Sequence, residues 1–374
     1  MIFLLIASYP DSLVKFRGPL IDALIQKGFQ VHIAAPDIAD NACLKDELKC
    51  KGIIVHDIPL HRTGINPVAD AKTFFHLLKL IRKIKPDYVM GYTIKPVIYG
   101  SLAAWFGRVP NRFALITGLG YAFQEQDKAS KRGFIRQFAQ RLYTLALGTT
   151  HKVFFQNPDD QALFRQLNIL KPFTPSFVVN GSGVNISEYE VVPLPEHVHF
   201  LLIARLLGDK GVREYAQAAK QIKINHPEVG FDLVGWIDEN PDAIKQHELD
   251  TWVQEGTINY LGKLADVRPA ISNCSVYVLP SYREGTPRTV LEAMAMGRPI
   301  ITTDAPGCRE TVIHEDNGYL IPIKSVDDLV TAMEHFINNP ELTSRMSIRS
   351  RKIAEEKYDV NKVNAIMLRE MGIT

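Results

Sequence analysis

Two carboxylates border a short glycine-containing turn and the helical pattern that follows it. Glu284 precedes residues 285–287, which lead from the apolar run 276–279 into the helical pattern, and Glu292 lies more than one turn inside that pattern. A helix N-terminus presents unpaired N–H groups to an anion, and a glycine lets the backbone approach a ligand. A phosphate at the turn would leave the carboxylates to accept hydrogen bonds from neighbouring hydroxyls. The same spacing also fits a helix-start glutamate and an Arg288–Glu292 pair on a solvated face.

Two cations follow a second apolar run in a similar way. Arg205 and Lys210 come directly after residues 199–204. A forked guanidinium and a compact ammonium suit the two phosphates of a diphosphate, and they would stabilise the charge that grows on a leaving diphosphate. Taken alone, the segment is equally typical of an ordinary basic loop. Two cations and two carboxylates at the strand ends of one domain together favour a functional site.

The elements that must position these residues alternate along the whole chain. Short apolar runs separated by helix-period segments predict an α/β protein, with parallel sheets covered by helices on both faces. Strands are expected at 2–7, 31–35, 53–58, 87–91, 113–116, 153–156, 199–204, 231–234, 258–261, 276–279 and 300–303. A proline-containing break at 191–196 predicts a linker between two doubly wound domains, whose ligands bind beyond the carboxyl ends of the strands.

Composition excludes several classes of protein. The 374 residues carry 43 basic and 41 acidic side chains, a balance that excludes a nucleic-acid coat. Four cysteines without a C-x-x-C pair indicate neither a disulfide scaffold nor a cysteine-rich zinc site, and they fit a reducing cytoplasm. The chain has no D-x-D and no H-x3-H pattern, so no metal site is predicted. The opening apolar run is too short to span a membrane.

The whole chain resembles the retaining family 4 glycosyltransferases. Glu284 and Glu292 match the family's E-x7-E motif, and Arg205 and Lys210 match its Arg…Lys pair. Segments 93–96 and 117–121 resemble the subgroup that builds bacterial glycans on a polyprenyl diphosphate, which includes N-acetylgalactosaminyltransferases. The resemblance implies the GT-B fold, in which two Rossmann-like domains face a central cleft. We expect an acceptor-binding domain at 1–190, a nucleotide-sugar domain at 196–357, and residues 359–374 packed back on the first domain.

The resemblance also implies an activity and a set of site residues. The expected reaction moves a sugar, an N-acetylhexosamine, with retention from a UDP-sugar to a polyprenyl-diphosphate-linked saccharide in capsule, O-antigen or N-glycan synthesis. It uses no metal and no other cofactor. The implied catalytic residues are Arg205, Lys210 and Glu284. Donor binding is assigned to Gly235, Leu264, Gly285, Thr286, Pro287 and Glu292. Acceptor binding is assigned to Arg17, Lys95, Thr117 and Gly118.

The chain departs from the family in its first half. Many members carry a histidine where this chain has Thr117, so a histidine-dependent role is not expected there. The glycine pair that often follows the first strand is also missing. Arg17, in the loop that replaces it, fits either the diphosphate of the acceptor or a solvated position at a helix start.

One segment has a marked charge imbalance. Residues 128–142 hold five basic side chains and no acidic one, and the apolar residues recur at helical spacing. Such a helix suits the headgroup layer of an anionic membrane, which predicts peripheral attachment to the inner face of the cytoplasmic membrane. The expected contacts are Lys131, Arg132, Phe134, Arg136 and Phe138. The alternative is a helix that packs its apolar face on its own sheet and exposes a basic back.

Two other functions fit the same architecture. A sugar-nucleotide epimerase or hydrolase would need an acid and a base beside the sugar, and no histidine–carboxylate group lies near Glu284 in the sequence. A non-catalytic nucleotide-sugar sensor would not need to stabilise a leaving group, whereas Arg205 and Lys210 are both present.

Overall fold

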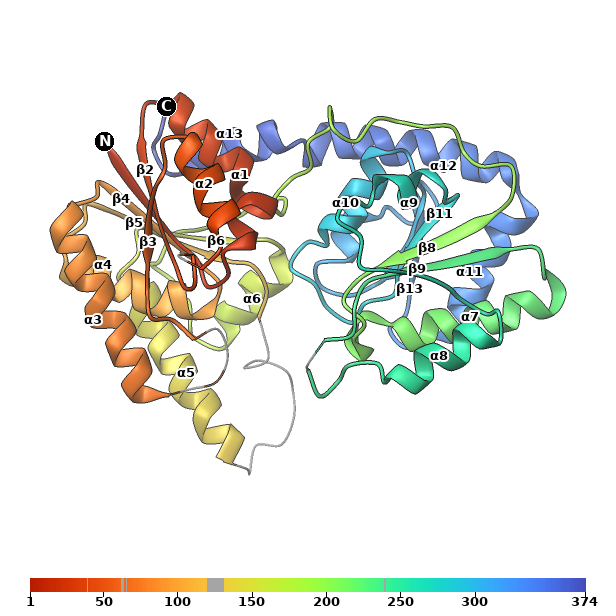
Figure 1. Ribbon diagram of the computed structural model, residues 1–374, viewed down its shortest axis with the longest axis horizontal. Helices are drawn as coiled ribbons and strands as arrows, with labels where there is room; N and C mark the ends of the chain where they lie inside the picture. Colours follow the sequence, from red (N-terminus) through yellow and green to blue (C-terminus); the bar gives the residue numbers. More distant parts are fainter. Residues whose placement is uncertain (39, 62–63, 65, 120–130, 239) are drawn as a thin grey trace. The chain divides into compact units, whose positions relative to one another are not determined.

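The computed structural model describes residues 1–374 except 39, 62–63, 65, 120–130 and 239, and it leaves out the side chains of 131–136 and 138. The chain forms two compact units (Figure 1). The first comprises Met1–Ser182 and Asn364–Thr374, and the second comprises Gly183–Val363.

The first unit is built on a parallel seven-stranded sheet in the order β3-β2-β1-β4-β5-β6-β7. Its strands are β1 (Ile2–Ile6), β2 (Gln30–Ala35), β3 (Ile54–Asp57), β4 (Tyr88–Tyr92), β5 (Asn111–Ile116), β6 (Lys152–Phe155) and β7 (Ser176–Val178). Its helices are α1 (Asp11–Gln26), α2 (Ala42–Cys50), α3 (Pro67–Ile84), the π-helical turn η1 (Pro96–Gly100), α4 (Ser101–Phe106), α5 (Lys131–Leu147) and α6 (Pro158–Gln166).

Helices cover both faces of this sheet. Helices α1 and α2 pack one face together with the C-terminal helix, and α3, α4 and α5 pack the other (Figure 1). Because both faces are buried, the central strand β1 is apolar along its whole length, as its continuous run in the sequence predicts, whereas the edge strand β3 is more exposed and contains His56 and Asp57. The short strand β7 was not predicted.

The second unit repeats the architecture with a parallel six-stranded sheet in the order β10-β9-β8-β11-β12-β13. Its strands are β8 (His199–Ile203), β9 (Gly230–Val234), β10 (Asn259–Gly262), β11 (Val276–Leu279), β12 (Ile300–Thr303) and β13 (Gly318–Ile321). Its helical segments are η3 (Gly208–Lys210), α7 (Val212–Asn225), α8 (Gln246–Gln254), α9 (Arg268–Ser272), α10 (Arg288–Ala295), η4 (Arg309–Thr311), α11 (Val326–Asn338), α12 (Pro340–Ile353) and η5 (Ala354–Tyr358).

The last helix, α13 (Val360–Glu370), belongs to both units. Its first residues stay with the second unit, where Val360 pairs with Val184. Its later part joins the core of the first unit through Met367 and Leu368, and Lys152 Nζ lies 2.8 Å from a Glu370 carboxylate oxygen. The chain therefore returns to the unit in which it began.

The division between the units falls earlier than the predicted break. The composition change at 191–196 suggested domains at 1–190 and 196–357, whereas contacts separate Ser182 from Gly183. Residues 183–195 belong to the second unit because buried groups of that unit hold them. The guanidinium of Arg298, fully buried, donates to the carbonyl oxygens of Val192 (3.0 Å) and Pro193 (3.2 Å).

We expect Arg298→Ala to destabilise the second unit. The guanidinium also donates to the carbonyls of Ile271 and Ser272, so the substitution would remove four hydrogen bonds made by a fully buried side chain. The free energy of unfolding in urea should fall by about 3 kcal/mol or more. Lys352→Ala, at an exposed cation of the same unit, should change it by about 0.5 kcal/mol or less. A wild-type value for Arg298→Ala would contradict the role of this side chain.

A histidine pair predicts acid sensitivity of the first unit. His32 Nδ1 lies 2.9 Å from His56 Nε2 on the adjacent strands β2 and β3, and the rings stack. Burial, together with the positive charges that His32 and Lys83 can carry beside it, lowers the pKa of His56 from 6.5 to about 4. The unfolded chain therefore takes up a proton first, and the folded state loses stability as the pH falls from 6.5 towards about 4. In thermal melts, the melting temperature of His56→Gln should fall less steeply with decreasing pH than that of wild type. His76→Gln, which alters an exposed histidine, should show the same fall as wild type.

Candidate functional site

The cations and carboxylates converge where the strand order of the second sheet reverses. Strands β8 and β11 are neighbours at the centre of this sheet. Arg205 and Lys210 follow β8, and Glu284 follows β11. Because the strands are parallel, both loops leave from the same edge, which is where open α/β sheets bind ligands. The topology therefore places residues 74 positions apart side by side.

The two loops touch through a glycine. Gly211 has a φ of +69°, and a β-carbon there would lie 2.2 Å from the carbonyl oxygen of Pro280. Only glycine allows this approach without moving one backbone away from the other. Tyr282 N–H donates to the Asp209 carbonyl across the same contact. The loop after β8 is thereby fixed against the loop after β11.

Lys210 and Glu284 form a direct ion pair at this contact. Lys210 Nζ lies 2.6 Å from Glu284 Oε1, and both side chains are less than one-fifth exposed. The buried hydroxyl of Ser281 donates to the same oxygen at 2.9 Å. The carboxylate is therefore oriented by two donors before any substrate arrives.

Electrostatics keep this lysine charged. Burial lowers the pKa of Lys210, but the ionised Glu284 and its hydrogen bond raise it more, and the net pKa lies above its ordinary value. Burial also raises the pKa of the nearby Asp209, which for a carboxyl disfavours the charged form. Its Oδ1 is buried and finds no hydrogen-bond donor among the described residues.

Arg205 lies beside the end of the neighbouring strand β9. Its guanidinium donates to Asp238 at 3.0 Å, with about two-fifths of the side chain exposed. Gly235 directly follows β9, and a β-carbon there would lie 1.9 Å from the carbonyl oxygen of Ala204. This position needs glycine because the backbone of Ala204 and the side chain of Leu206, on either side of Arg205, pack directly against it.

Glu292 is buried rather than solvated. It lies in the second turn of α10, is 6% exposed, and accepts from Arg288 at 2.7 Å. The helical Arg288–Glu292 pair that the spacing suggested is therefore formed, but its carboxylate lies inside the unit. Burial raises the pKa of the Tyr189 hydroxyl, and its hydrogen bond and charge contact with Glu292 raise it further. Tyr189, which lies before the predicted start of the second domain at residue 196, therefore contacts Glu292.

Helix α10 begins at the same edge of the sheet. Pro287 is its N-cap residue, and no side-chain hydrogen bond caps it. The hydroxyl of Tyr277 lies 2.7 Å from Thr289 in the first turn and donates to the Ile203 carbonyl at 3.1 Å, which ties the helix start to the end of β8. Gly285 and Thr286 form the turn before the helix, as the sequence indicated.

The last predicted donor residue follows the edge strand β10. Leu264 is partly buried against the core beneath α9 and α10. Beside it, Lys263 Nζ lies 4.9 Å above the ring of Trp236, the residue after Gly235. The loops after β9 and β10 therefore meet at this edge, next to the loop that carries Arg205.

Predicted acceptor residues of the first unit lie at the corresponding edge of its own sheet. Lys95 follows β4 and pairs with Asp70 at 2.8 Å, with both side chains about nine-tenths buried. Arg17 is also buried rather than solvated, and it stacks over the ring of Tyr92 at 5.3 Å. The backbone of Thr93 has a φ of +69°, a strained conformation for a β-branched residue.

Two further acceptor residues follow the neighbouring strand. Thr117 and Gly118 are half-buried directly after β5. The strand pairs with β4, so they share the edge with Lys95. The structure thus brings the acceptor assignments to one edge of the first sheet and the donor assignments to one edge of the second.

A helix forms in the segment that the sequence predicted to contact a membrane. Helix α5 spans Lys131–Leu147, whereas the side chains of Lys131, Arg132, Phe134, Arg136 and Phe138 lie outside the described residues. Among the described residues, no helix is both long and apolar enough to cross a bilayer. The same residues contain no cluster of three or more histidine, cysteine or carboxylate side chains suited to a metal ion.

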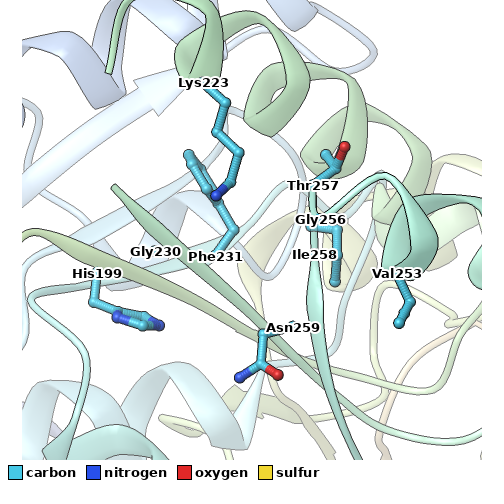
Figure 2. Close-up of a pocket in the computed structure, with 9 residues that line it drawn as sticks. All are labelled: His199, Lys223, Gly230, Phe231, Val253, Gly256, Thr257, Ile258 and Asn259. Carbon is cyan, nitrogen blue, oxygen red and sulfur yellow. The ribbon is translucent and has the colours of Figure 1, made fainter. Parts of the chain in front are cut away.

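A pocket of about 300 Å³ opens at the opposite edge of the second sheet. His199, Gly230 and Asn259, the first residues of β8, β9 and β10, line it (Figure 2). The buried Asp232 accepts from Asn259 at 2.7 Å and lies 3.0 Å from the His199 ring. Since the pocket lies at the amino ends of the strands, it is separate from the Lys210–Glu284 site.

Three contributors escaped the sequence reasoning. Ser281 and Asp238 orient Glu284 and Arg205, and Tyr189 reaches Glu292. For Ser281 and Asp238, a position just beyond a predicted strand was the available signal. No signal in the sequence pointed to Tyr189, because it lies far from the other site residues along the chain.

The chain is similar to known proteins along nearly its whole length. Residues 192–353 match the family model described as glycosyl transferases group 1, and residues 4–157 match glycosyl transferase 4-like. The chain is 30% identical, over 94% of its length and 93% of the relative's, to N,N'-diacetylbacillosaminyl-diphospho-undecaprenol alpha-1,3-N-acetylgalactosaminyltransferase of Campylobacter jejuni. It is 26% identical, over 83% and 81%, to UDP-Gal:alpha-D-GlcNAc-diphosphoundecaprenol alpha-1,3-galactosyltransferase of Escherichia coli.

Solved structures share the fold at low identity. Sucrose-phosphate synthase of Thermosynechococcus elongatus superposes with a TM-score of 0.80 at 18% identity, covering 99% of this chain and 98% of the other. The paired doubly wound sheets are the GT-B architecture that the sequence predicted. Matched over both halves and related along nearly its full length, the chain belongs to the group 1 glycosyltransferases.

Proposed function

We propose that this glycosyltransferase moves a sugar from a UDP-sugar to a polyprenyl-diphosphate-linked saccharide, with retention and without a metal, in the assembly of bacterial capsule, O-antigen or N-glycan. The sugar is an N-acetylhexosamine. The observation that carries the proposal is the Lys210–Glu284 pair at the switch point of the second sheet, where a diphosphate and a sugar can be held together. The names of the Campylobacter and Escherichia relatives support the acceptor class.

The residues of the second unit take distinct roles in this reaction. Lys210 and Arg205 neutralise the two phosphates of the departing diphosphate, replacing the charge that a metal ion would supply. The N-terminus of α10 adds its unpaired N–H groups to the same anion. Glu284 accepts a hydrogen bond from a sugar hydroxyl, and Glu292 accepts from the ribose.

Glu284 is a poor covalent nucleophile in this setting. Its Oε1 accepts from both Lys210 and Ser281, so it is stabilised as an anion and held in place. The proposed step is therefore a same-face displacement. The acceptor oxygen bonds to the anomeric carbon as the bond from that carbon to the diphosphate oxygen breaks, and the leaving phosphate takes the acceptor's proton.

The first unit receives the acceptor at the carboxyl edge of its sheet. Arg17 and the Thr117–Gly118 turn contact the acceptor's diphosphate, and Lys95 supports that edge from its buried pair with Asp70. A lipid-linked acceptor also implies that the enzyme works on the inner face of the cytoplasmic membrane, as a peripherally attached cytoplasmic protein.

A panel of sugar nucleotides tests the proposal. With synthetic polyprenyl-diphosphate saccharides, a UDP-N-acetylhexosamine should give the extended product by mass spectrometry, with an unchanged anomeric configuration by NMR. The rate should be unaffected by a chelator. An inverted product or chelator sensitivity would contradict the mechanism. Conversion of the donor alone at the full rate would instead indicate an epimerase or hydrolase, and binding without turnover would indicate a sensor.

Glu284→Gln and Lys210→Met should reduce transfer by about a hundredfold to a thousandfold, the usual cost of losing one preorganised charged group. Glu248→Gln is the matched control, because Glu248 forms a comparable ion pair with Arg213 elsewhere in the same unit. All three variants should show wild-type circular dichroism. Near-normal turnover in Glu284→Gln or Lys210→Met would overturn the assignment.

A further inference from the structure

The outer face of α3 carries an unusual exposed stripe. Val68, Lys72, Phe75, Lys79 and Arg82 recur at intervals of four and three residues, so they share one side of the helix, and all are exposed. Phe75 is 65% exposed and Val68 is 81% exposed. The opposite side of α3 is buried in the core of the first unit. The apolar side chains of the stripe are therefore not part of the hydrophobic core of the first unit.

Aromatic rings extend this stripe onto the neighbouring helix. Phe74 contacts Phe75 at 5.2 Å and Phe106, at the end of α4, at 5.8 Å between ring centroids. Trp105 lies 4.8 Å from Phe106 by the same measure. Trp105 and Phe106 are each about half exposed. We call Phe75, Trp105 and Phe106, with the cations around them, the α3–α4 surface.

The charge around these rings has one sign. The sequence of α3 contains Lys72, Lys79, Arg82 and Lys83, all exposed, and a single acidic residue, Asp70. Asp70 is buried in its pair with Lys95 and contributes nothing to the surface. The sequence of α4 has no acidic residue, and that of α5, which packs on the same face of the sheet, has four basic residues and no acidic one.

Aromatic rings framed by cations are the composition that an anionic bilayer selects. Tryptophan and phenylalanine partition into the interface between headgroups and acyl chains, and lysine and arginine pair with acidic headgroups. A protein partner with complementary carboxylates would account for the cations. It would not account for the exposed apolar stripe between them. The charge pattern therefore favours lipid.

We propose that the α3–α4 surface is a membrane-docking face, which inserts Phe75, Trp105 and Phe106 into an anionic lipid surface while Lys72, Lys79 and Arg82 contact its headgroups. The choice of a bilayer as partner rests on the lipid-linked acceptor of the proposed function. This surface is distinct from the start of α5 that the sequence singled out, and its side chains are described in the structure.

Two variants separate the two contributions to docking. Phe75→Ser/Trp105→Ser removes the rings, and Lys72→Gln/Lys79→Gln removes two cations. Phe173→Ser is the matched control, because Phe173 is 78% exposed elsewhere in the same unit. Full-length proteins are floated with vesicles of phosphatidylethanolamine and phosphatidylglycerol, and with vesicles of phosphatidylcholine alone.

We expect wild type and Phe173→Ser to bind the phosphatidylglycerol vesicles. Each cation removed should weaken this binding about fivefold at low salt, with little change on phosphatidylcholine. Removing the rings should weaken binding to both kinds of vesicle and at high salt as well. Wild-type flotation of both variants would overturn the proposal. So would loss of self-association in the ring variant with flotation unchanged, which would make the surface an interface between copies.

Activity on two acceptors separates this proposal from the function on which it rests. With a water-soluble short-chain acceptor, both variants should transfer sugar at the wild-type rate, because the altered residues lie outside the site. With a full-length acceptor embedded in vesicles, their rates should fall in parallel with flotation. If wild type transfers to neither acceptor, the proposed function fails whatever the flotation shows. If all proteins transfer equally to both, only the docking face fails.

Discussion

The buried contact between Lys210 and Glu284 is the constraint on which the arrangement of the candidate site in the second unit depends. Either charge alone would be costly in a position so little exposed to water, because burial disfavours an unpaired ion. Together they are tolerated, and Ser281 satisfies the carboxylate further. The pair in turn requires the loops after β8 and β11 to touch, which the bare backbone of Gly211 allows. A site for a charged ligand is thus prepared by the same contacts that hold two loops together.

The two units share one sheet topology but place different chemical groups at its carboxyl edge. In each sheet the strand order reverses at the centre, between β1 and β4 in the first unit and between β8 and β11 in the second. The second unit keeps Arg205 partly exposed, available to an anion. The first unit buries Lys95 against Asp70 and stacks Arg17 on Tyr92, so its cations also stabilise the fold.

A net charge of +2 conceals a marked local asymmetry. Helices α3 and α5 cover the same face of the first sheet, and their sequences place eight basic residues against one acidic residue. The aromatic rings of α3 and α4 lie within this basic region. Balanced overall charge and a strongly cationic face are compatible because acidic residues outnumber basic ones in the sequence of the second unit.

The sequence by itself determined the fold class, the predicted strands and the motif residues. Continuous apolar runs report strands that are buried on both faces, and Arg205, Lys210, Glu284 and Glu292 all stand beside such elements, so local patterns were sufficient. Only the tertiary structure decided what depends on distant contacts. It buried Glu292, assigned residues 183–195 to the second unit through Arg298, and revealed the roles of Tyr189 and Ser281. It also showed that Phe75 and Phe106 share one cluster through Phe74, because helix packing, rather than spacing along the chain, brings α3 against α4.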